Sequence, residues 1–220
     1  CRRKALRKLR LLLGDDHTLV RHGLRKILEE QPEWEVVSEV GDGREAVREA
    51  VAQKPDVAII DVAMPLLNGI DATQQIVRRV PETRVLMLSM HADEAYVMRA
   101  LQAGATGYMV KDSAGKELLT AVETVAAGRR YFSPAIEKLV QDDQGRTAGA
   151  GFADRYETLS TREREIFQLI AEARSNKEVA ALLDISPATV ETHRARILQK
   201  LDVHNIAEVV LYAVRRGIIS

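Results

Sequence analysis

The 220-residue chain is short of cysteine and of long apolar runs, and each shortage excludes a class of protein. Its single cysteine, Cys1, rules out internal disulfide bonds and suits a reducing cytoplasm. No apolar stretch approaches the roughly twenty residues that cross a bilayer, so no membrane partner is expected. A secretory signal is also missing, because the basic beginning leads directly into a predicted strand with charged residues close behind. The sequence therefore predicts a cytoplasmic protein.

The beginning of the chain is strongly basic. Six of the first ten residues are Lys or Arg, and the first residue is not Met. A tag remnant, a truncation and a native extension all fit this composition. Residues 1–8 are therefore treated as a basic N-terminal extension to which no function is assigned.

Length and composition favour two domains. The chain is longer than one typical domain, and its 46% hydrophobic content is enough to fill two modest cores. Residues 141–155 are rich in Gly, Ala and charged residues, as flexible linkers are. A short helix is expected just before them, from about Pro134 to Val140.

Polar residues follow four short apolar runs in the first half, each where the run ends. Leu9–Leu13 precedes Asp15 and Asp16, Val57–Ile60 precedes Asp61, Val85–Leu88 precedes Ser89, and Tyr108–Val110 precedes Lys111. Amphipathic stretches of helical length alternate with the predicted strands, and these helices are expected at about 17–30, 43–53, 69–79, 93–102 and 113–126. This alternation predicts five β/α units and a parallel sheet. Because functional groups in such sheets gather beyond the carboxyl ends of the strands, these polar residues are predicted to form one site.

The residue types at this site suggest phosphoryl chemistry. Three carboxylates repel one another unless a cation lies among them, and oxygen ligands suit Mg²⁺. Asp61 is then a candidate nucleophile that forms an aspartyl phosphate. Lys111 and the Ser89 hydroxyl can hold the phosphoryl oxygens that the metal leaves uncovered. Each residue alone is an ordinary turn or surface group, but their shared position at strand ends favours the functional interpretation.

Residues 9–126 resemble the receiver domain of a two-component response regulator, which has a flavodoxin-like α/β fold with a five-stranded parallel sheet. The resemblance rests on Leu-Leu-Leu-Gly-Asp-Asp-His at 11–17, Asp-Val-Ala-Met-Pro-Leu-Leu-Asn-Gly at 61–69, Leu-Ser-Met at 88–90 and Gly-Ala-Thr-Gly-Tyr-Met-Val-Lys-Asp at 104–112. It implies that a sensor histidine kinase phosphorylates Asp61. It further implies a Mg²⁺ ion at Asp15, Asp16, Asp61 and the backbone carbonyl of Ala63. Phosphoryl contact and switching are assigned by the same resemblance to Ser89, Tyr108 and Lys111, with Tyr108 moving between an outward and an inward rotamer.

Three helix starts stand out in the second half. Each helix follows a serine that caps it, and the expected helices are at about 161–173, 176–183 and 187–201. Pro187 occupies the first position of the third helix, where its missing N–H does no harm. The short turn between the last two helices predicts a helix-turn-helix. Helix spacing alone leaves a small protein-binding bundle open as an alternative.

Residues 158–219 resemble the LuxR-type (NarL/FixJ) DNA-binding domain. The resemblance rests on Leu-Ser-Thr-Arg-Glu-Arg-Glu-Ile, Ser-Asn-Lys-Glu-Val-Ala and Thr-Val-Glu-Thr-His-Arg-Ala-Arg-Ile-Leu-Gln-Lys-Leu. It implies binding to double-stranded DNA, and a homodimer when phosphorylated or DNA-bound. Charge adds little, because residues 160–220 hold nine Lys/Arg against eight Asp/Glu.

Periodicity assigns the faces of the third helix. Val190, Ile197 and Leu201 recur at helical spacing and are predicted to be core. The opposite side should face base edges, while flanking cations and the N-terminus of the preceding helix contact phosphates. His193 is equally well explained as a packed side chain. The predicted DNA-binding residues are Ser175, Asn176, Lys177, Ala188, Thr189, Glu191, Thr192, His193, Arg194, Arg196 and Lys200.

The resulting prediction is an α/β receiver domain followed by an all-α helix-turn-helix domain. The receiver domain is expected at 9–128, a linker at 129–156 and the LuxR-type domain at 157–220. The helix at 206–216 is a candidate dimer contact through Val209, Val210, Ala213 and Val214, although core packing explains the same apolar face.

Two other classes of function are alternatives to a phosphorylation-dependent transcription regulator. A phosphatase that passes through an aspartyl phosphate generally needs a second acid just after the nucleophile, but Val62 and Ala63 follow Asp61. The second alternative is an interaction protein that has a receiver domain but has lost DNA binding. Only one residue favours it, because Glu191 stands where a basic residue would suit DNA. The protein is therefore not expected to be an enzyme.

Overall fold

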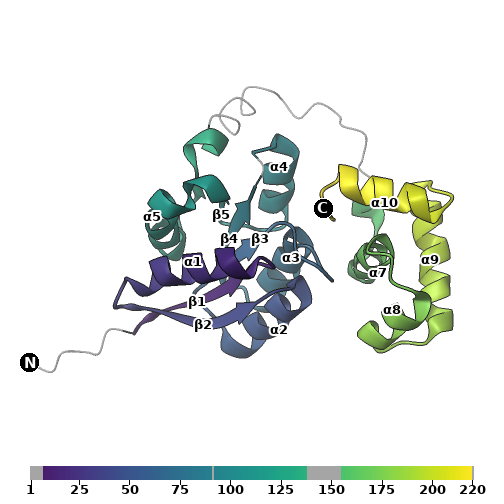
Figure 1. The fold of residues 1–220 in the computed structure, drawn as a ribbon, viewed down its shortest axis with the longest axis horizontal. Coiled ribbons are helices and arrows are strands. Elements are labelled where there is room, and N and C mark those ends of the chain that lie inside the picture. The colour runs from purple at the N-terminus through teal and green to yellow at the C-terminus, as the bar shows by residue number, and fades with distance from the viewer. Residues whose placement is uncertain (1–6, 91, 138–154, 220) are drawn as a thin grey trace, which may run out of the picture.

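The computed structural model describes residues 7–90, 92–137 and 155–219. Within these ranges the first part is an α/β unit and the last part is a unit of helices (Figure 1). Residues 134–137 are helical, at the start of the helix expected from Pro134 to Val140. The rest of that helix, and residues 141–154 of the expected linker, lie outside the described residues. No helix in the described part is long and apolar enough to cross a membrane.

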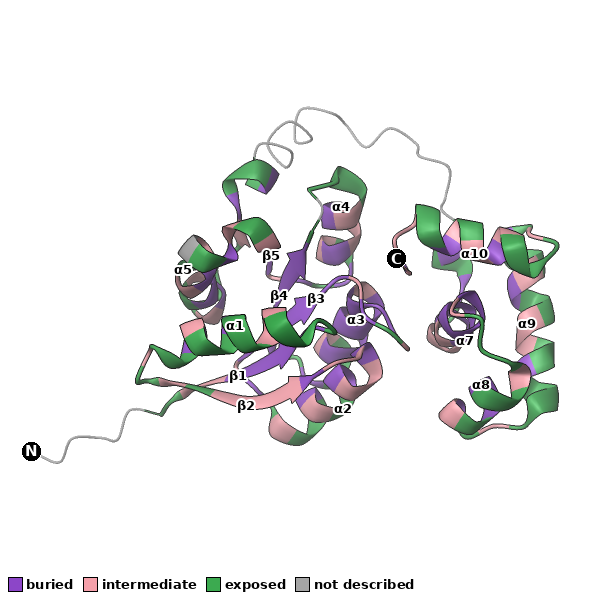
Figure 2. Ribbon diagram, in the orientation of Figure 1, coloured by how far each residue is buried: buried purple, intermediate pink, exposed green. Residues whose placement is uncertain are grey.

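A parallel sheet with strand order β2-β1-β3-β4-β5-β6 forms the centre of the α/β unit. Its strands are β1 (Leu9–Gly14), β2 (Trp34–Val40), β3 (Val57–Asp61), β4 (Arg84–Ser89), β5 (Gly107–Val110) and β6 (Tyr131–Phe132). The central strands are continuous apolar runs because helices cover both faces, and Figure 2 shows these strands as buried. The predicted α/β fold is confirmed.

The sheet has one strand more than the predicted five. Tyr131 and Phe132 pair in parallel with Gly107 and Tyr108, inside the segment assigned to the linker. Gly128, with φ of +79°, turns the chain back toward the sheet before this strand. Two residues are too few to show a strand periodicity, so the sequence could not reveal β6.

The helices of the α/β unit agree with the expected ranges to within a residue. They are α1 (Thr18–Glu29), α2 (Gly43–Gln53), α3 (Gly69–Arg79), α4 (Glu94–Gln102) and α5 (Ala114–Ala126). Helices α1 and α5 pack on one face of the sheet, and α2, α3 and α4 pack on the other. Strand order reverses between β1 and β3, so the carboxyl ends of these two neighbouring strands mark the switch point.

The helical unit begins with the 3₁₀ turn η2 (Arg155–Thr158) and continues with α7 (Thr161–Ala171), α8 (Asn176–Leu183), α9 (Pro187–Leu201) and α10 (Ile206–Arg215). Ser160 and Ser175 each form the predicted capping box, and Ser186 caps α9. One hydrophobic core, with Phe167 at 0% exposure, joins all four helices. The helix-turn-helix is therefore present as α8, a short turn and α9.

Candidate functional site

The predicted phosphoryl site lies at one edge of the sheet. Gly14 at the end of β1 pairs with Ile60 of β3, and Asp61 pairs with Leu88 of β4. The residues that follow these positions therefore meet at the switch point, and a cavity of about 410 Å³ there is lined by Asp16, Asp61, Ala63, Ser89 and Lys111, among others. The structure thus brings the predicted receiver-site residues together.

Four side chains at this edge of the sheet are close enough to share a metal ion. One possible ligand atom of each of Asp15, Asp16, His17 and Asp61 lies within 4.8 Å of the others. Asp15 and Asp61 are buried, while Asp16 is exposed. His17 was not predicted; its Nδ1 lies 2.7 Å from Asp16 Oδ1. Three carboxylates and a nearby backbone carbonyl are hard oxygen donors, so this set fits Mg²⁺, and the imidazole adds no ligand of that kind.

Lys111 lies between two of these carboxylates. Its Nζ is 2.7 Å from Asp61 Oδ2 and 2.8 Å from Asp15 Oδ2. Burial disfavours the charged amine, but the attraction of Asp61 and Asp15 outweighs it, so the pKa of Lys111 is raised. The ammonium group is therefore available at neutral pH to meet added negative charge at Asp61.

Asp61 has an unusual acidity. Burial raises the pKa of its carboxyl to about 6, because the opposing effect of Lys111 is smaller than the cost of desolvation, and Asp15 and Asp16 add repulsion. A buried carboxylate whose charge is only partly compensated is a group that a bound cation would stabilise.

Ser89 and Tyr108 are both buried beside this site. Their side chains share a hydrogen bond, and burial raises the pKa of the Tyr108 hydroxyl to about 12. Tyr108 is fully buried, so of the two rotamers considered from the sequence, this structure holds the inward one. Because the Tyr108 hydroxyl is hydrogen-bonded to Ser89, a movement of the Ser89 side chain would change the contacts of Tyr108.

The second predicted site lies on α9. Val190, Ile197 and Leu201 are buried in the helical core, whereas Ala188, Glu191, Thr192 and Ala195 are all exposed, as the periodicity predicts. Arg196 is exposed and Arg194 half-buried. Serine 175 caps α8 beside Asn176 and Lys177. The side chain of Asn176 donates to Glu191, so these two predicted residues are in contact.

Three predicted DNA-binding residues have internal interactions or buried atoms, and for His193 packing was the alternative that the sequence left open. Lys200 Nζ lies 2.7 Å from Glu163 Oε2 and 3.2 Å from the Thr158 carbonyl oxygen. The Thr192 hydroxyl donates to the Ala188 carbonyl, so its methyl group is the less committed part of the side chain. His193 Nδ1 is buried and has no hydrogen-bond partner among the described residues.

Helix α10 divides its apolar residues between two faces. Val209 and Ala213 are buried in the helical core, in agreement with core packing. Ile206, Leu211 and Val214 are 43%, 49% and 49% exposed. These exposed residues differ from the dimer-contact residues that the sequence suggested, and only Val214 belongs to both groups.

Two family models match this chain. The model of the response regulator receiver domain matches residues 11–123, and that of the luxR family of bacterial regulatory proteins matches residues 157–213. Together with the strand-end site and the helix-turn-helix, these matches define the class. The chain belongs to the two-component response regulators with a LuxR-type DNA-binding domain, and its two units are the receiver domain and the DNA-binding domain.

Known transcriptional regulators and solved response regulators are similar to this chain. The chain is 35% identical to the transcriptional regulatory protein DegU of Brevibacillus brevis, with 96% of this chain and 94% of DegU covered. A LuxR-family response regulator from Aurantimonas sp. SI85-9A1 is 37% identical, with a TM-score of 0.60 over 63% of this chain and 99% of that chain. The response regulator RcsB in its DNA complex is 25% identical, with a TM-score of 0.58 over 94% of this chain and 98% of that chain.

Proposed function

We propose that a sensor histidine kinase phosphorylates this protein on Asp61 and that phosphorylation controls its binding to DNA. The observation that carries the proposal is the position of Asp61. It ends the central strand β3, among two further carboxylates and one buried lysine. As a DNA-binding regulator, the protein acts in the cytoplasm and performs signalling rather than metabolic catalysis.

The acidic cluster supplies the ligands for a metal ion. Asp15, Asp16 and Asp61, with the backbone carbonyl of Ala63, would hold Mg²⁺. When bound, the ion neutralises part of the charge on the phosphoryl oxygens. The fit rests on the hard oxygen donors and on the repulsion that burial leaves uncompensated at Asp61.

The reaction needs little from the protein beyond position and charge. An Asp61 carboxylate oxygen attacks phosphorus, so a P–O bond forms while the P–N bond to the donor histidine breaks. The imidazole leaves with the electron pair and then takes up a proton from solvent. Lys111 exchanges part of its contact with the carboxylates for a phosphoryl oxygen, and the Ser89 hydroxyl donates to another. Tyr108, hydrogen-bonded to Ser89, is then placed to report the change.

The DNA-binding domain would read DNA through α9. Glu191 and Thr192, which are exposed on α9, would face base edges, and the exposed Arg196 and half-buried Arg194 would contact phosphates. Binding of DNA by the similar RcsB supports this role. A homodimer formed on DNA or after phosphorylation would match a two-half-site operator. The receiver domain would then be residues 9–128 extended by β6, the DNA-binding domain residues 157–220 preceded by the start of η2 at Arg155, and the linker the part of 129–156 between β6 and η2.

Acetyl phosphate tests the proposal without the cognate kinase. Incubation with acetyl phosphate and Mg²⁺ should add one acid-stable, base-labile phosphoryl group. Asp61→Ala should abolish the label, while Asp112→Ala, at an exposed aspartate beside Lys111, should retain it. Selection of bound duplexes from a random pool, with and without the donor, then tests control of DNA binding. Full labelling of Asp61→Ala would overturn the assignment.

A further inference from the structure

The two domains share a polar interface that is buried on both sides. Arg164 of α7 lies 3.0 Å from Asp71 Oδ1 of α3, and the Tyr156 hydroxyl donates to Asp71 Oδ2 at 2.7 Å. Asp71 is 4% exposed and Arg164 is 8% exposed. A buried charge of this kind needs its partner, so this pair favours one particular docking of the domains.

The same helix α7 holds the loop that follows Asp61. Gln168, which is fully buried, accepts from the Asn68 backbone N–H at 2.6 Å and donates to the Met64 carbonyl at 2.8 Å. One turn later, Glu172 accepts from the Leu66 N–H at 2.8 Å. Leu66 has φ of +64°, a left-handed conformation that a leucine adopts only when its surroundings impose it. The DNA-binding domain therefore contacts the backbone within a few residues of the acceptor.

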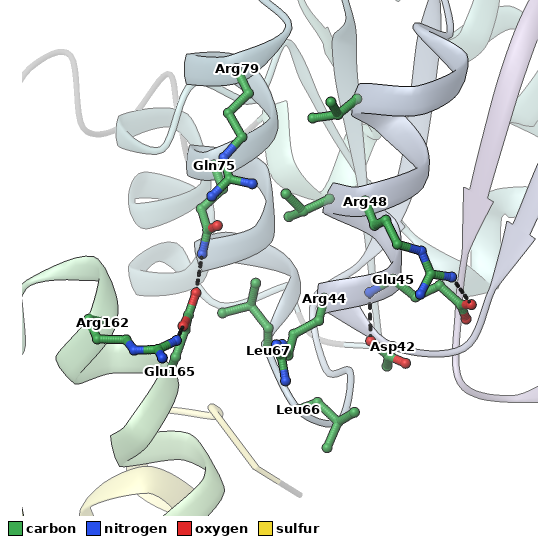
Figure 3. A pocket seen from close by; sticks show the side chains of 12 residues that line it. Asp42, Arg44, Glu45, Arg48, Leu66, Leu67, Gln75, Arg79, Arg162 and Glu165 are labelled. Carbon is green, nitrogen blue, oxygen red and sulfur yellow. Dashed lines mark hydrogen bonds and ion pairs between the residues drawn. The ribbon is translucent and has the colours of Figure 1, made fainter. Parts of the chain in front are cut away.

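Further contacts extend the interface along α2 and α3. A groove of about 610 Å³ lies there, and at its edge Gln75 of α3 donates to Glu165 of α7 at 3.1 Å. Figure 3 shows this pair among the lining side chains. Arg44, at the start of α2, donates to the Leu182 carbonyl in α8. Both contacts join the receiver domain to the helices that precede α9.

The end of the DNA-binding domain lies against α4, whose Tyr96 also lines the acceptor cavity. Arg99 donates to the Arg216 carbonyl at 2.9 Å. Gly217 has φ of +59°, and a Cβ atom built on it would lie 1.4 Å from the Tyr96 hydroxyl oxygen. Only glycine fits this close approach. Val214, Gly217 and Ile219 consequently line the same 410 Å³ cavity as Asp61 and Lys111.

The docked arrangement leaves the DNA-reading face of α9 uncovered. Ala188, Glu191, Thr192 and Ala195 are all exposed, and Figure 1 shows α9 on the side of its domain away from the receiver domain. Docking instead adds Val214, Gly217 and Ile219 of the DNA-binding domain to the wall of the acceptor cavity. Docking of the domains should therefore affect access to Asp61 rather than access to α9.

We propose that the docked DNA-binding domain selects the phosphodonor by size: small acyl phosphates reach Asp61, whereas a donor histidine carried on a folded domain does not. This inference rests on the proposed role of Asp61 as acceptor. A cavity of about 410 Å³ lies within the usual range for small-molecule sites, so it admits a small donor. A kinase must bring a protein surface up to the cavity, and Val214, Gly217 and Ile219 occupy part of the cavity wall. Kinase phosphorylation then requires the domains to separate, and by linkage a bound kinase favours the separated form.

Access to the cavity can be measured with two probes of different size that carry the same thiol-reactive group. In a Cys1→Ser background, Ala63→Cys places a thiol in the cavity wall next to the acceptor strand. N-ethylmaleimide is the small probe, and a maleimide joined by a short linker to a small globular protein stands in for the donor domain. Asp71→Ala removes the receiver-side partner of Arg164 and should separate the domains. Glu123→Ala, at an exposed position on α5, is the matched control.

The expected result is a size-dependent difference. N-ethylmaleimide should label all chains at similar rates, while the protein-borne maleimide should label the Asp71→Ala chain at least about tenfold faster than its parent and the Glu123→Ala control. Gly217→Ala, whose added methyl group collides with Tyr96, should act in the same direction from the other side of the interface. Equal rates of the protein-borne probe in the parent, Asp71→Ala and Gly217→Ala would overturn the inference. The proposed function is tested separately in the parent chain, because failure of acetyl phosphate to label Asp61 would remove the acceptor itself.

Discussion

The ammonium group of Lys111 lies 2.7 Å from the Asp61 carboxylate at the buried end of β3. This ion pair does not offset the loss of water around Asp61, since the pKa of the carboxyl still rises to about 6. Burial of the ionised Asp61 carboxyl therefore costs folding free energy unless a cation is bound beside it. Mg²⁺ would supply the missing positive charge, so metal binding and stability should be linked.

Asp61→Asn should stabilise the metal-free protein at neutral pH. The folded-state pKa lies above the unfolded value, so the contribution of the Asp61 carboxyl is fully favourable below about pH 4 and is lost as the pH rises through about 6. Asparagine does not ionise and should raise the free energy of unfolding near pH 7.5 by on the order of 1–3 kcal/mol. Urea unfolding in EDTA measures the difference, which should shrink toward pH 4. A variant less stable than the parent at both pH values would contradict this explanation.

Asp16→Asn should weaken Mg²⁺ binding while leaving the receiver domain folded. Removing one of three crowded carboxylates relieves repulsion but deletes a metal ligand, and a loss of about tenfold or more in affinity is expected. Calorimetric titration with Mg²⁺ gives the affinity, and the thermal midpoint without metal reports the fold. Asp112→Asn makes the same change at an exposed carboxylate beyond β5 and should leave both values as they were. An unaltered titration in Asp16→Asn would remove Asp16 from the metal site.

Lys200→Ala should destabilise the DNA-binding domain. Although burial opposes its ionisation, hydrogen bonds from Lys200 and Ser160 keep the pKa of Glu163 below its usual value. Losing the Lys200 contact should cost about 1 kcal/mol of unfolding free energy at neutral pH. Because a lowered carboxyl pKa stabilises above the unfolded value, the difference should fade as the pH drops below about 4.5. Lys177→Ala, at an exposed lysine of α8, is the control, and an equal effect there would refute the role of this pair.

The parts predictable from sequence were those with strong local signals. Apolar runs such as Val57–Asp61 are long enough to show a strand, and serine caps locate the helices of the second domain within one or two residues. Helical periodicity also sorted α9 correctly, because Val190 and Ile197 must reach the core. The site residues follow the carboxyl ends of the strands. Once the strands are known, parallel topology brings these ends to one edge of the sheet, so the grouping of the site residues could be predicted.

The parts that could not be predicted depend on contacts between distant residues. Gln168 and Asn68 meet across 100 positions of sequence, and an isolated glutamine on an amphipathic helix has no pattern that predicts a buried role. The partner of Lys200 is similarly remote, so a residue assigned to phosphate contact was found in an ion pair. Gly217 follows the last helix like an ordinary C-terminal glycine, and only the position of Tyr96 explains its close approach.

Arg196 and the exposed threonine and glutamate of α9 should affect DNA binding in different ways. Arg196→Ala removes a phosphate contact, so binding to all sequences should weaken alike, and the slope of log affinity against log salt should become shallower by roughly one unit. Binding measured at two salt concentrations on a panel of duplexes gives both quantities. Lys26→Ala, at an exposed lysine on α1 of the receiver domain, should leave the slope unchanged.

Substitution of Glu191 or Thr192 should instead change which half-site is preferred. Glu191 can accept from a cytosine amino group, and Thr192, whose hydroxyl already bonds to Ala188, offers its methyl group to a thymine methyl. Either substitution should shift preference at one base position by about 1–3 kcal/mol while leaving the salt slope intact. Variants of an operator selected from a random pool, changed one base pair at a time, provide the measurement. If Arg196→Ala relaxed preference at a single base pair and kept the full salt slope, the assignment of the α9 faces to bases and phosphates would be wrong.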